Sequence, residues 1–386
     1  MKGKFQRGKV VTVSIGHFSH DVYTSFLAPV LPLLIDKLGV SLAMAGFLDV
    51  VRKVPALFNP LLGLLADRTD VKYFVILTPA VSSVAMSLLG MAPTYFILLV
   101  LLFVTGISST LFHIPSPVMI RNLAGNRTGT GMSYYMFGGE LARSVGPLLI
   151  TAAISLWGLE GSYRVMPFGI AASVVLYFKL RNIKPIHREE SRPGDKSIGE
   201  TLRNLLPFFI AVGGFLLFRA AMKSALTFYL PTYLTGQGNS LWIANASLSV
   251  MQFSGALGTF GSGHIADKIS HKKVLILSGF LTPVAMLAFI YADNMLVFPL
   301  LFILGLLLFA SGPVMLALVQ ETNTRRPAFV NSIYMFISFG VSSLMVLFVG
   351  ILGDSFGLEI TFKVSAVFAF LSPVFLFMLP AKKTEK

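Results

Sequence analysis

The residues of this chain with the greatest capacity for chemistry are ionisable side chains that lie inside long apolar runs. His20 and Asp21 follow His17 by three and four residues, which puts all three close to one face of a helix. A charge in apolar surroundings costs free energy, so such groups normally have a partner or face water. The full set is His17, His20, Asp21, Asp49, Arg52, Lys53, His113, Glu140, Arg143, Arg219 and Lys223.

Two cations of the C-terminal half stand out, because Arg219 and Lys223 share a helical face and no acid of that half lies deep enough to match them. We expect both to bind substrate, together with His20, Asp21 and His113. The set has three acids (Asp21, Asp49, Glu140) against five bases (Arg52, Lys53, Arg143, Arg219, Lys223). This excess of two positive charges favours an anionic or zwitterionic solute. A neutral lipophilic solute is the alternative if Arg219 and Lys223 pair with Asp21 and Glu140.

Some of these charges are spaced to neutralise one another locally. Asp49 with Arg52 or Lys53, and Glu140 with Arg143, have helical pairing distances, which predicts self-contained pairs. Proton coupling is expected at Asp21, Glu140 or His20, since carboxylates and histidines can bind a proton reversibly when a protein tunes them. Alternatively, the carboxylates serve only as counter-ions, and His17 is a histidine hydrogen-bonded inside a packed bundle.

The elements that must position these residues are membrane-spanning helices. With 55% hydrophobic and 12% charged residues, the chain has too little polar surface for a soluble domain of its length. About 20 apolar residues span a bilayer. Twelve segments qualify: 10–34, 42–65, 73–92, 94–120, 129–156, 163–180, 204–234, 241–266, 273–292, 295–320, 328–353 and 358–380. We therefore predict an all-α integral membrane protein with an N-terminal six-helix bundle (1–180), a basic cytoplasmic linker (181–203) and a C-terminal six-helix bundle (204–386).

An internal sequence repeat indicates that the chain has two homologous halves. Gly63, Asp67 and Arg68, with Lys72 downstream, return 200 positions later as Gly263, Asp267 and Lys268, with Lys272 downstream. The segment 133–137 likewise resembles 332–336 at an offset of 199. Because each copy of the first motif joins two apolar runs, we interpret it as a structural latch that holds one conformation of its half.

Basic residues concentrate in one set of connections, including the N-terminal tail, segment 179–203 and the C-terminus, whereas the other set has essentially only Lys37. The positive-inside rule then places both termini in the cytoplasm. The net charge of +14 is mostly this topological signal, so we expect contact with anionic lipid and no nucleic-acid partner. Zero cysteines, six histidines without metal-ligand spacing and no nucleotide-binding loop predict no metal, no cofactor and no enzymatic activity.

The latch motif and the two halves of six resemble the major facilitator superfamily. His17, His20 and Asp21, Phe112 with His113, and the glycines of 138–146 resemble its fosmidomycin-resistance branch of efflux carriers. The resemblance implies a monomeric carrier of the inner membrane that exports a small solute by alternating access, with protons as coupling ion. Gly146 and Pro147 resemble the antiporter signature of drug efflux carriers. Gradient-driven uniport, uptake by symport and a non-transporting sensor or scaffold are the alternatives.

Overall fold

The computed structural model describes residues 5–58, 72–183, 198–320, 322 and 327–378. Within these ranges the chain is helical and contains no strand. Nine stretches of the described residues are long and apolar enough to cross a membrane. They are Arg7–Leu38, Lys72–Met91, Tyr95–Ala124, Thr130–Leu180, Leu202–Gly236, His271–Ile290, Val297–Val319, Ile333–Phe356 and Leu358–Leu376.

These stretches account for ten of the twelve expected segments, because Thr130–Leu180 contains two of them, 129–156 and 163–180. A turn at Ser162–Val165 separates helix α8 (Thr128–Gly161) from α9 (Met166–Leu180). The segment expected at 241–266 is α12 (Leu241–Ile269). The described part of the segment expected at 42–65 is α3 (Leu42–Lys53) with a short 3-10 helix, η1 (Val54–Phe58). The predicted all-helical membrane fold is confirmed.

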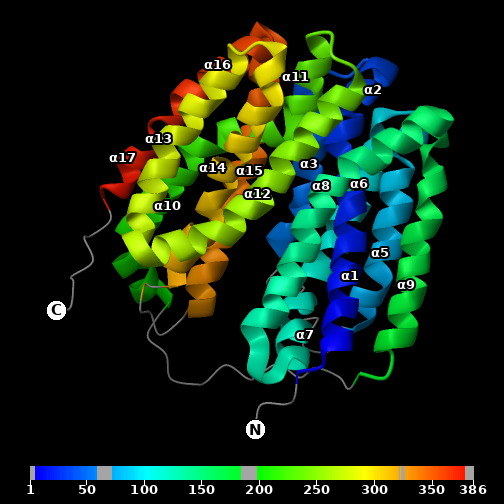
Figure 1. Cartoon of the computed structure of the whole chain (residues 1–386), viewed down its shortest axis with the longest axis horizontal. Helices are drawn as coiled ribbons and strands as arrows, with labels where there is room; N and C mark the ends of the chain where they lie inside the picture. The colour runs from blue at the N-terminus through cyan, green and yellow to red at the C-terminus, as the bar shows by residue number, and fades with distance from the viewer. Residues whose placement is uncertain (1–4, 59–71, 184–197, 321, 323–326, 379–386) are drawn as a thin grey trace. The chain divides into compact units, whose positions relative to one another are not determined.

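The chain packs as two compact units (Figure 1). The first comprises the described residues of Met1–Glu189 and Leu230–Phe253, and the second those of Glu190–Tyr229 and Ser254–Lys386. Leu230–Phe253 belongs to the first unit partly through Asn245, whose amide donates to Thr151 Oγ1 at 2.7 Å and to the Pro29 carbonyl at 3.3 Å. The domain boundaries expected around 181–203 stay a prediction.

The first helix of the chain is broken where its prolines require it. α1 (Arg7–Thr24) ends five residues before Pro29, and α2 (Leu27–Leu38) continues the span. A proline removes one backbone donor and clashes with the carbonyl four residues earlier, which here belongs to Ser25. Arg52 Nη1 donates to the neighbouring Thr24 carbonyl at 2.8 Å, so a side chain satisfies backbone left open by the break.

A second break lies between α6 (Tyr95–His113) and α7 (Pro115–Ala124). Pro115 and Pro117 follow it directly, and neither can donate a backbone hydrogen bond to the preceding turn. The break makes His113 the last residue of α6. α5 (Lys72–Ser87) packs against α1, α6 and α9 and completes the surroundings of the N-terminal polar residues.

α8 packs closely on α1 because glycines face it. A Cβ added at Gly138 would lie 2.6 Å from the Ser14 carbonyl oxygen, and one at Gly139 would lie 2.4 Å from His17 Cε1. A Cβ at Gly146 would lie 2.7 Å from the Val22 carbonyl oxygen. These glycines therefore allow close packing of α8 on α1.

The second unit is built from α10 (Ile198–Ser224), α13 (His271–Ile290), α14 (Val297–Gln320), α15 (Pro327–Phe356), α16 (Leu358–Ala369), α17 (Ser372–Leu376) and the later part of α12. α10 runs into a π-helical turn, η5 (Ala225–Tyr229), before α11 (Leu230–Gly236). A buried cluster with Phe215, Leu275 and Met315 packs α10, α13 and α14 together.

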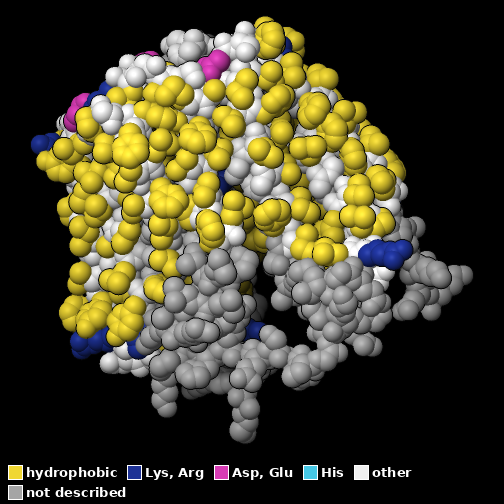
Figure 2. Space-filling model, turned by 180° about the vertical axis from the view of Figure 1, so that it is seen from behind, with side chains coloured by type: hydrophobic (Ala, Val, Ile, Leu, Met, Phe, Trp, Pro, Cys, Tyr) yellow, Lys and Arg dark blue, Asp and Glu magenta, His cyan; other side chains and the backbone are white. Residues whose placement is uncertain are grey.

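Hydrophobic side chains cover most of the described surface in Figure 2, and Lys and Arg lie mainly at its margins. Large side chains such as Phe96, Phe168 and Phe260 are about two-thirds exposed, at 68%, 70% and 67%. A soluble protein rarely exposes such extensive apolar surface. This surface is suited to contact with lipid.

Candidate functional site

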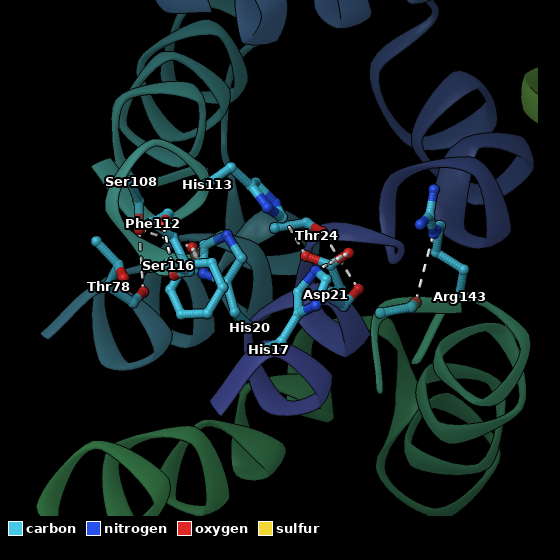
Figure 3. A network of polar contacts seen from close by, with 12 residues as sticks. His17, His20, Asp21, Thr24, Thr78, Ser108, Phe112, His113, Ser116 and Arg143 are labelled. Carbon is cyan, nitrogen blue, oxygen red and sulfur yellow. Dashed lines mark hydrogen bonds and ion pairs between the residues drawn. The ribbon is translucent and has the colours of Figure 1, made fainter. Parts of the chain in front are cut away.

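The polar centre of the first unit is a triad formed by His17 and Asp21 of α1 and His113 of α6 (Figure 3). His17 Nε2 lies 3.3 Å from Asp21 Oδ2, and His113 Nε2 lies 3.3 Å from Asp21 Oδ1. His17 and Asp21 are buried, whereas 39% of the His113 side chain is exposed. The break before Pro115 thus holds one histidine at the accessible edge of an otherwise buried cluster.

Tyr135 of α8 contacts the Nδ1 atoms of both His17 and His113, opposite the ring nitrogens that face Asp21. His17 Nδ1 lies 2.8 Å from the Tyr135 carbonyl oxygen, and His113 Nδ1 lies 3.3 Å from the Tyr135 hydroxyl. A carbonyl oxygen only accepts, so His17 Nδ1 must donate, and in the neutral ring Nε2 then carries the lone pair. The ring of Tyr135 also stacks on His17, with centroids 4.0 Å apart.

His20 lies beside the triad but joins a different network (Figure 3). Its Nδ1 is 3.2 Å from Ser82 Oγ, which is 2.8 Å from Ser108 Oγ, and Ser108 donates to the Thr78 carbonyl at 3.0 Å. His20 is fully buried, and its ring stacks on Phe112 with centroids 4.6 Å apart. These contacts tie α1 to α5 and α6, so its predicted contact with substrate stays untested.

The local charge pairs expected from spacing are confirmed. Lys53 Nζ lies 2.6 Å from Asp49 Oδ2, and Arg52 Nε donates to Asp49 Oδ1 at 3.1 Å. Arg143 Nη2 donates to Glu140 Oε1 at 2.8 Å. The other oxygen, Glu140 Oε2, is buried and has no hydrogen-bond partner among the described residues.

Arg219 of α10 has partners that the sequence did not reveal. Its guanidinium donates to the carbonyls of Leu308 at 2.8 Å, Leu307 at 3.1 Å and Ser278 at 3.3 Å. The residue is only 4% exposed, and the ring of Phe215 lies 5.7 Å from Arg219 Cζ. The side chain therefore joins α10 to α13 and α14, and its predicted role in substrate binding stays a prediction.

Lys223 lies one helical turn after Arg219 and is exposed. Its Nζ is 5.6 Å from the centroid of the Phe309 ring. Arg219 and Lys223 therefore share a helical face but differ in their surroundings. Arg219 is buried, and of the pair only Lys223 has an exposed side chain.

The internal repeat extends to these buried contacts. The offset of 199 between segments 133–137 and 332–336 also relates His20 to Arg219. In the first unit the His20 network ends on Ser108 and the Thr78 carbonyl, and in the second Arg219 reaches the Leu308 and Ser278 carbonyls, 200 positions further along. In both units, a polar network that begins at the first span (α1 or α10) therefore reaches the third span (α5 or α13) and the fourth (α6 or α14).

The latch motif is described only in part. Gly63, Asp67 and Arg68 lie outside the described residues, as do the side-chain surroundings of Gly263 and Asp267 in α12. Lys72 is buried and donates to the Ile183 carbonyl at 3.0 Å, just beyond α9. Lys268 is exposed. The latch stays a prediction, with the bond from Lys72 as the observed contact of this region.

Two residues of this site are absent from the predicted set of site residues. The sequence shows His17 only as one of several ionisable residues in the first apolar run. A functional role and simple packing inside the helix bundle were equally good interpretations of it. Tyr135 carried one signal, since it lies in the repeated segment 133–137. Its role depends on a backbone carbonyl 118 positions from His17, which no spacing rule relates to that histidine.

The sequence profile described as Major Facilitator Superfamily matches residues 13–346. The chain belongs to this superfamily. The "Fosmidomycin resistance protein" of Escherichia coli (strain K12) is 25% identical over 386 residues, covering 98% of this chain and 94% of the relative. A "Multi-drug resistance efflux pump PmrA homolog" of Lactococcus lactis subsp. lactis (strain IL1403) is 26% identical, covering 68% of this chain and 67% of the relative.

Among solved structures, one similar to this chain is that of a bacterial homolog of the human lysosomal transporter Spinster, in an inward-facing and unoccupied conformation. The TM-score between the two structures is 0.81. The match has 16% sequence identity and covers 98% of this chain and 97% of the other. At that identity the likeness establishes the fold alone. Fold and family are those of multi-pass membrane transporters of small molecules, and no family of enzymes is indicated.

Proposed function

We propose that this protein exports a small anionic or zwitterionic solute across the cytoplasmic membrane by alternating access, in exchange for protons. The observation that carries the proposal is the superfamily match over residues 13–346, in a chain that also keeps polar residues buried inside its spans. Export is the direction favoured by the names of the resistance protein and the efflux pump that this chain resembles.

The substrate class follows from charge. Asp49 and Glu140 have their own cationic partners, and the buried guanidinium of Arg219 donates to backbone carbonyls, which leave its positive charge in place. An anionic group on the solute would offset the excess positive charge. We assign the direct contacts to the accessible side chains, Lys223 and His113, and indirect roles to Asp21, His20 and Arg219.

We assign the coupling proton to Glu140, one of the three expected carriers. Its Oε1 accepts from Arg143, while Oε2 is buried without a hydrogen-bond partner in the described structure. A proton on Oε2 would neutralise the carboxylate and weaken its attraction to Arg143, which links proton binding to a change in the α8 charge pair. Of the other expected carriers, Asp21 lies 3.3 Å from an imidazole nitrogen on each of two sides, and His20 Nδ1 lies 3.2 Å from the Ser82 hydroxyl.

The decisive measurement is transport in proteoliposomes with an imposed pH gradient, for anionic phosphonates beside cationic and neutral drugs. We expect gradient-driven movement of the anions. Movement that ignores the gradient would favour a uniporter, and movement of cationic or neutral compounds alone would overturn the charge argument. Absence of any movement would favour a sensor or scaffold.

The assignment to Glu140 is tested with Glu140→Gln beside Glu160→Gln. Glu160 is a matched control, because it pairs with Lys37 at 2.7 Å but has 66% of its side chain exposed. We expect Glu140→Gln to transport at the rate seen without a gradient, whereas Glu160→Gln keeps full acceleration by the gradient. Equal acceleration in both variants would remove Glu140 from the coupling mechanism.

The remaining parts of the proposal concern the whole protein. We propose a monomer with two six-helix halves, both termini in the cytoplasm, and basic cytoplasmic segments that contact anionic lipid. The latch residues Asp67 and Asp267, with Gly146 and Pro147 of α8, are proposed to control the conformational change rather than touch solute.

A further inference from the structure

The transport proposal gives His113 a contact with the solute and Asp21 an indirect role, but it does not use His17, Asp21 and His113 together as a set of metal-binding donors. Two imidazole nitrogens and a carboxylate oxygen, one from each residue, all lie within 4.8 Å of one another. Imidazole and carboxylate together suit zinc and neighbouring divalent transition metals. Among the described residues this is the one group of at least three histidine or acidic side chains that meets such a limit.

The contacts inside the triad do not have hydrogen-bond geometry, although they are short. His17 Nε2 and Asp21 Oδ1 are both buried, and neither has a hydrogen-bond partner in the described part of the chain. His17 Nε2 nevertheless lies 3.3 Å from Asp21 Oδ2, and His113 Nε2 lies 3.3 Å from Asp21 Oδ1. Buried polar atoms normally find a hydrogen-bond partner. Two buried atoms without one, His17 Nε2 and Asp21 Oδ1, together with the nearby His113 Nε2, therefore suggest a shared ligand.

The spacing fits a metal ion. Ligand atoms about 2.0–2.1 Å from a tetrahedral zinc ion lie about 3.3–3.4 Å from each other. Both nitrogen–oxygen separations in the triad are 3.3 Å. The two nitrogens are at most 4.8 Å apart, and a turn of the His113 side chain, 39% of which is exposed, would bring them closer.

Tyr135 supplies the outer support that metal-binding histidines usually have. Such a histidine donates its second ring N–H to a carbonyl or another polar group, which fixes the ring and exposes the lone pair of the first nitrogen. The Tyr135 carbonyl does this for His17 at 2.8 Å, and the Tyr135 hydroxyl faces His113 Nδ1 at 3.3 Å. One residue of α8 therefore orients both imidazoles toward Asp21.

We propose that His17 Nε2, His113 Nε2 and the Asp21 carboxylate bind one divalent transition-metal ion of the zinc type, with Tyr135 as a positioning residue. The ion reaches the site from the side of His113, the accessible member. Three protein ligands leave a fourth position to water. This site was not expected from the sequence, where the histidines show no metal-ligand spacing.

The test is a titration of the purified full-length protein, carrying no histidine tag, with Co²⁺, whose visible absorption reports low-symmetry coordination. The background is low because the chain has no cysteine and only six histidines. We expect one saturable Co²⁺ site per chain, displaced stoichiometrically by Zn²⁺. X-ray absorption of the Zn²⁺ form should show two imidazole ligands, a readout that needs no variant.

Variants locate the site. His113→Gln should abolish the Co²⁺ spectrum, and Tyr135→Phe, which keeps the ring and the backbone carbonyl, should weaken binding about tenfold. His264→Gln on α12 and His271→Gln at the start of α13 are matched controls and should bind as the wild type does. Gel filtration and thermal unfolding verify that each variant is folded.

Two results would overturn the proposal. One is the lack of saturable binding in the folded wild-type protein. The other is a site that survives His113→Gln but is lost with a control histidine. Neither result would refute the transport proposal, because that proposal assigns coupling to Glu140, needs only a solute contact from His113, and is measured without added metal.

Discussion

Arg219 has a structural role that its charge alone does not predict. The guanidinium donates to three backbone carbonyls in two other helices of its unit. A buried cation with several hydrogen bonds stabilises the protein, and its removal leaves the acceptors without that donor. The same residue was expected from its charge to bind substrate.

We therefore predict that Arg219→Met lowers the free energy of unfolding by about 2–4 kcal/mol, measured by thermal denaturation in detergent. Arg203→Met is the control, since Arg203 is an exposed residue of the same helix, and its effect should stay within about 0.5 kcal/mol. Lys223→Met should slow transport and leave stability unchanged. An Arg219→Met protein that is as stable as the wild type but does not transport would support direct binding of substrate instead.

The contact between α1 and α8 sets the geometry of the polar centre. Gly138, Gly139 and Gly146 let the α8 backbone approach α1, and this approach brings the Tyr135 carbonyl to His17. Glycine at these positions is thus explained by packing, beyond the general frequency of glycine in membrane helices. The proline after Gly146 contributes a carbonyl that accepts from Thr151 at 2.6 Å.

Gly139→Ala should disturb the site more than it disturbs the fold. The new Cβ would lie 2.4 Å from His17 Cε1, so the ring must move away from the Tyr135 carbonyl, at a cost of about 1–3 kcal/mol. We expect weaker Co²⁺ binding and slower transport. The control is Gly340→Ala in α15, where an added Cβ meets no described atom within 4 Å. If the two variants behave alike, the contact between α1 and α8 is looser than described.

Across the whole chain, the distribution of basic residues predicts the orientation in the membrane. The absence of cysteine makes the native sequence a ready background for single-cysteine labelling. We expect Arg181→Cys, just after α9, to react with a membrane-impermeant maleimide only from the cytoplasmic side. Asn239→Cys, between α11 and α12, should react only from outside. Labelling from the opposite sides would reverse the proposed topology.

Composition and short-range spacing were enough to predict several properties of this protein. The number of apolar runs predicted an all-helical membrane fold. The similar segments at offsets of 199 and 200 predicted an internal repeat. Helical geometry predicted the Asp49 and Glu140 pairs, because residues three and four apart on a helix are neighbours wherever the helix lies. These properties depend on composition and on spacing along the chain, and not on how the helices pack.

The tertiary structure decided which residues of different helices meet. His17 meets His113 and Tyr135 only because α1, α6 and α8 pack with particular rotations, set by the glycines of α8 and the break before Pro115. Arg219 is buried and Lys223 exposed, although both are cations on one helical face. Hydropathy and spacing do not contain such information, because the rotation and depth of a helix depend on side chains distant in the sequence.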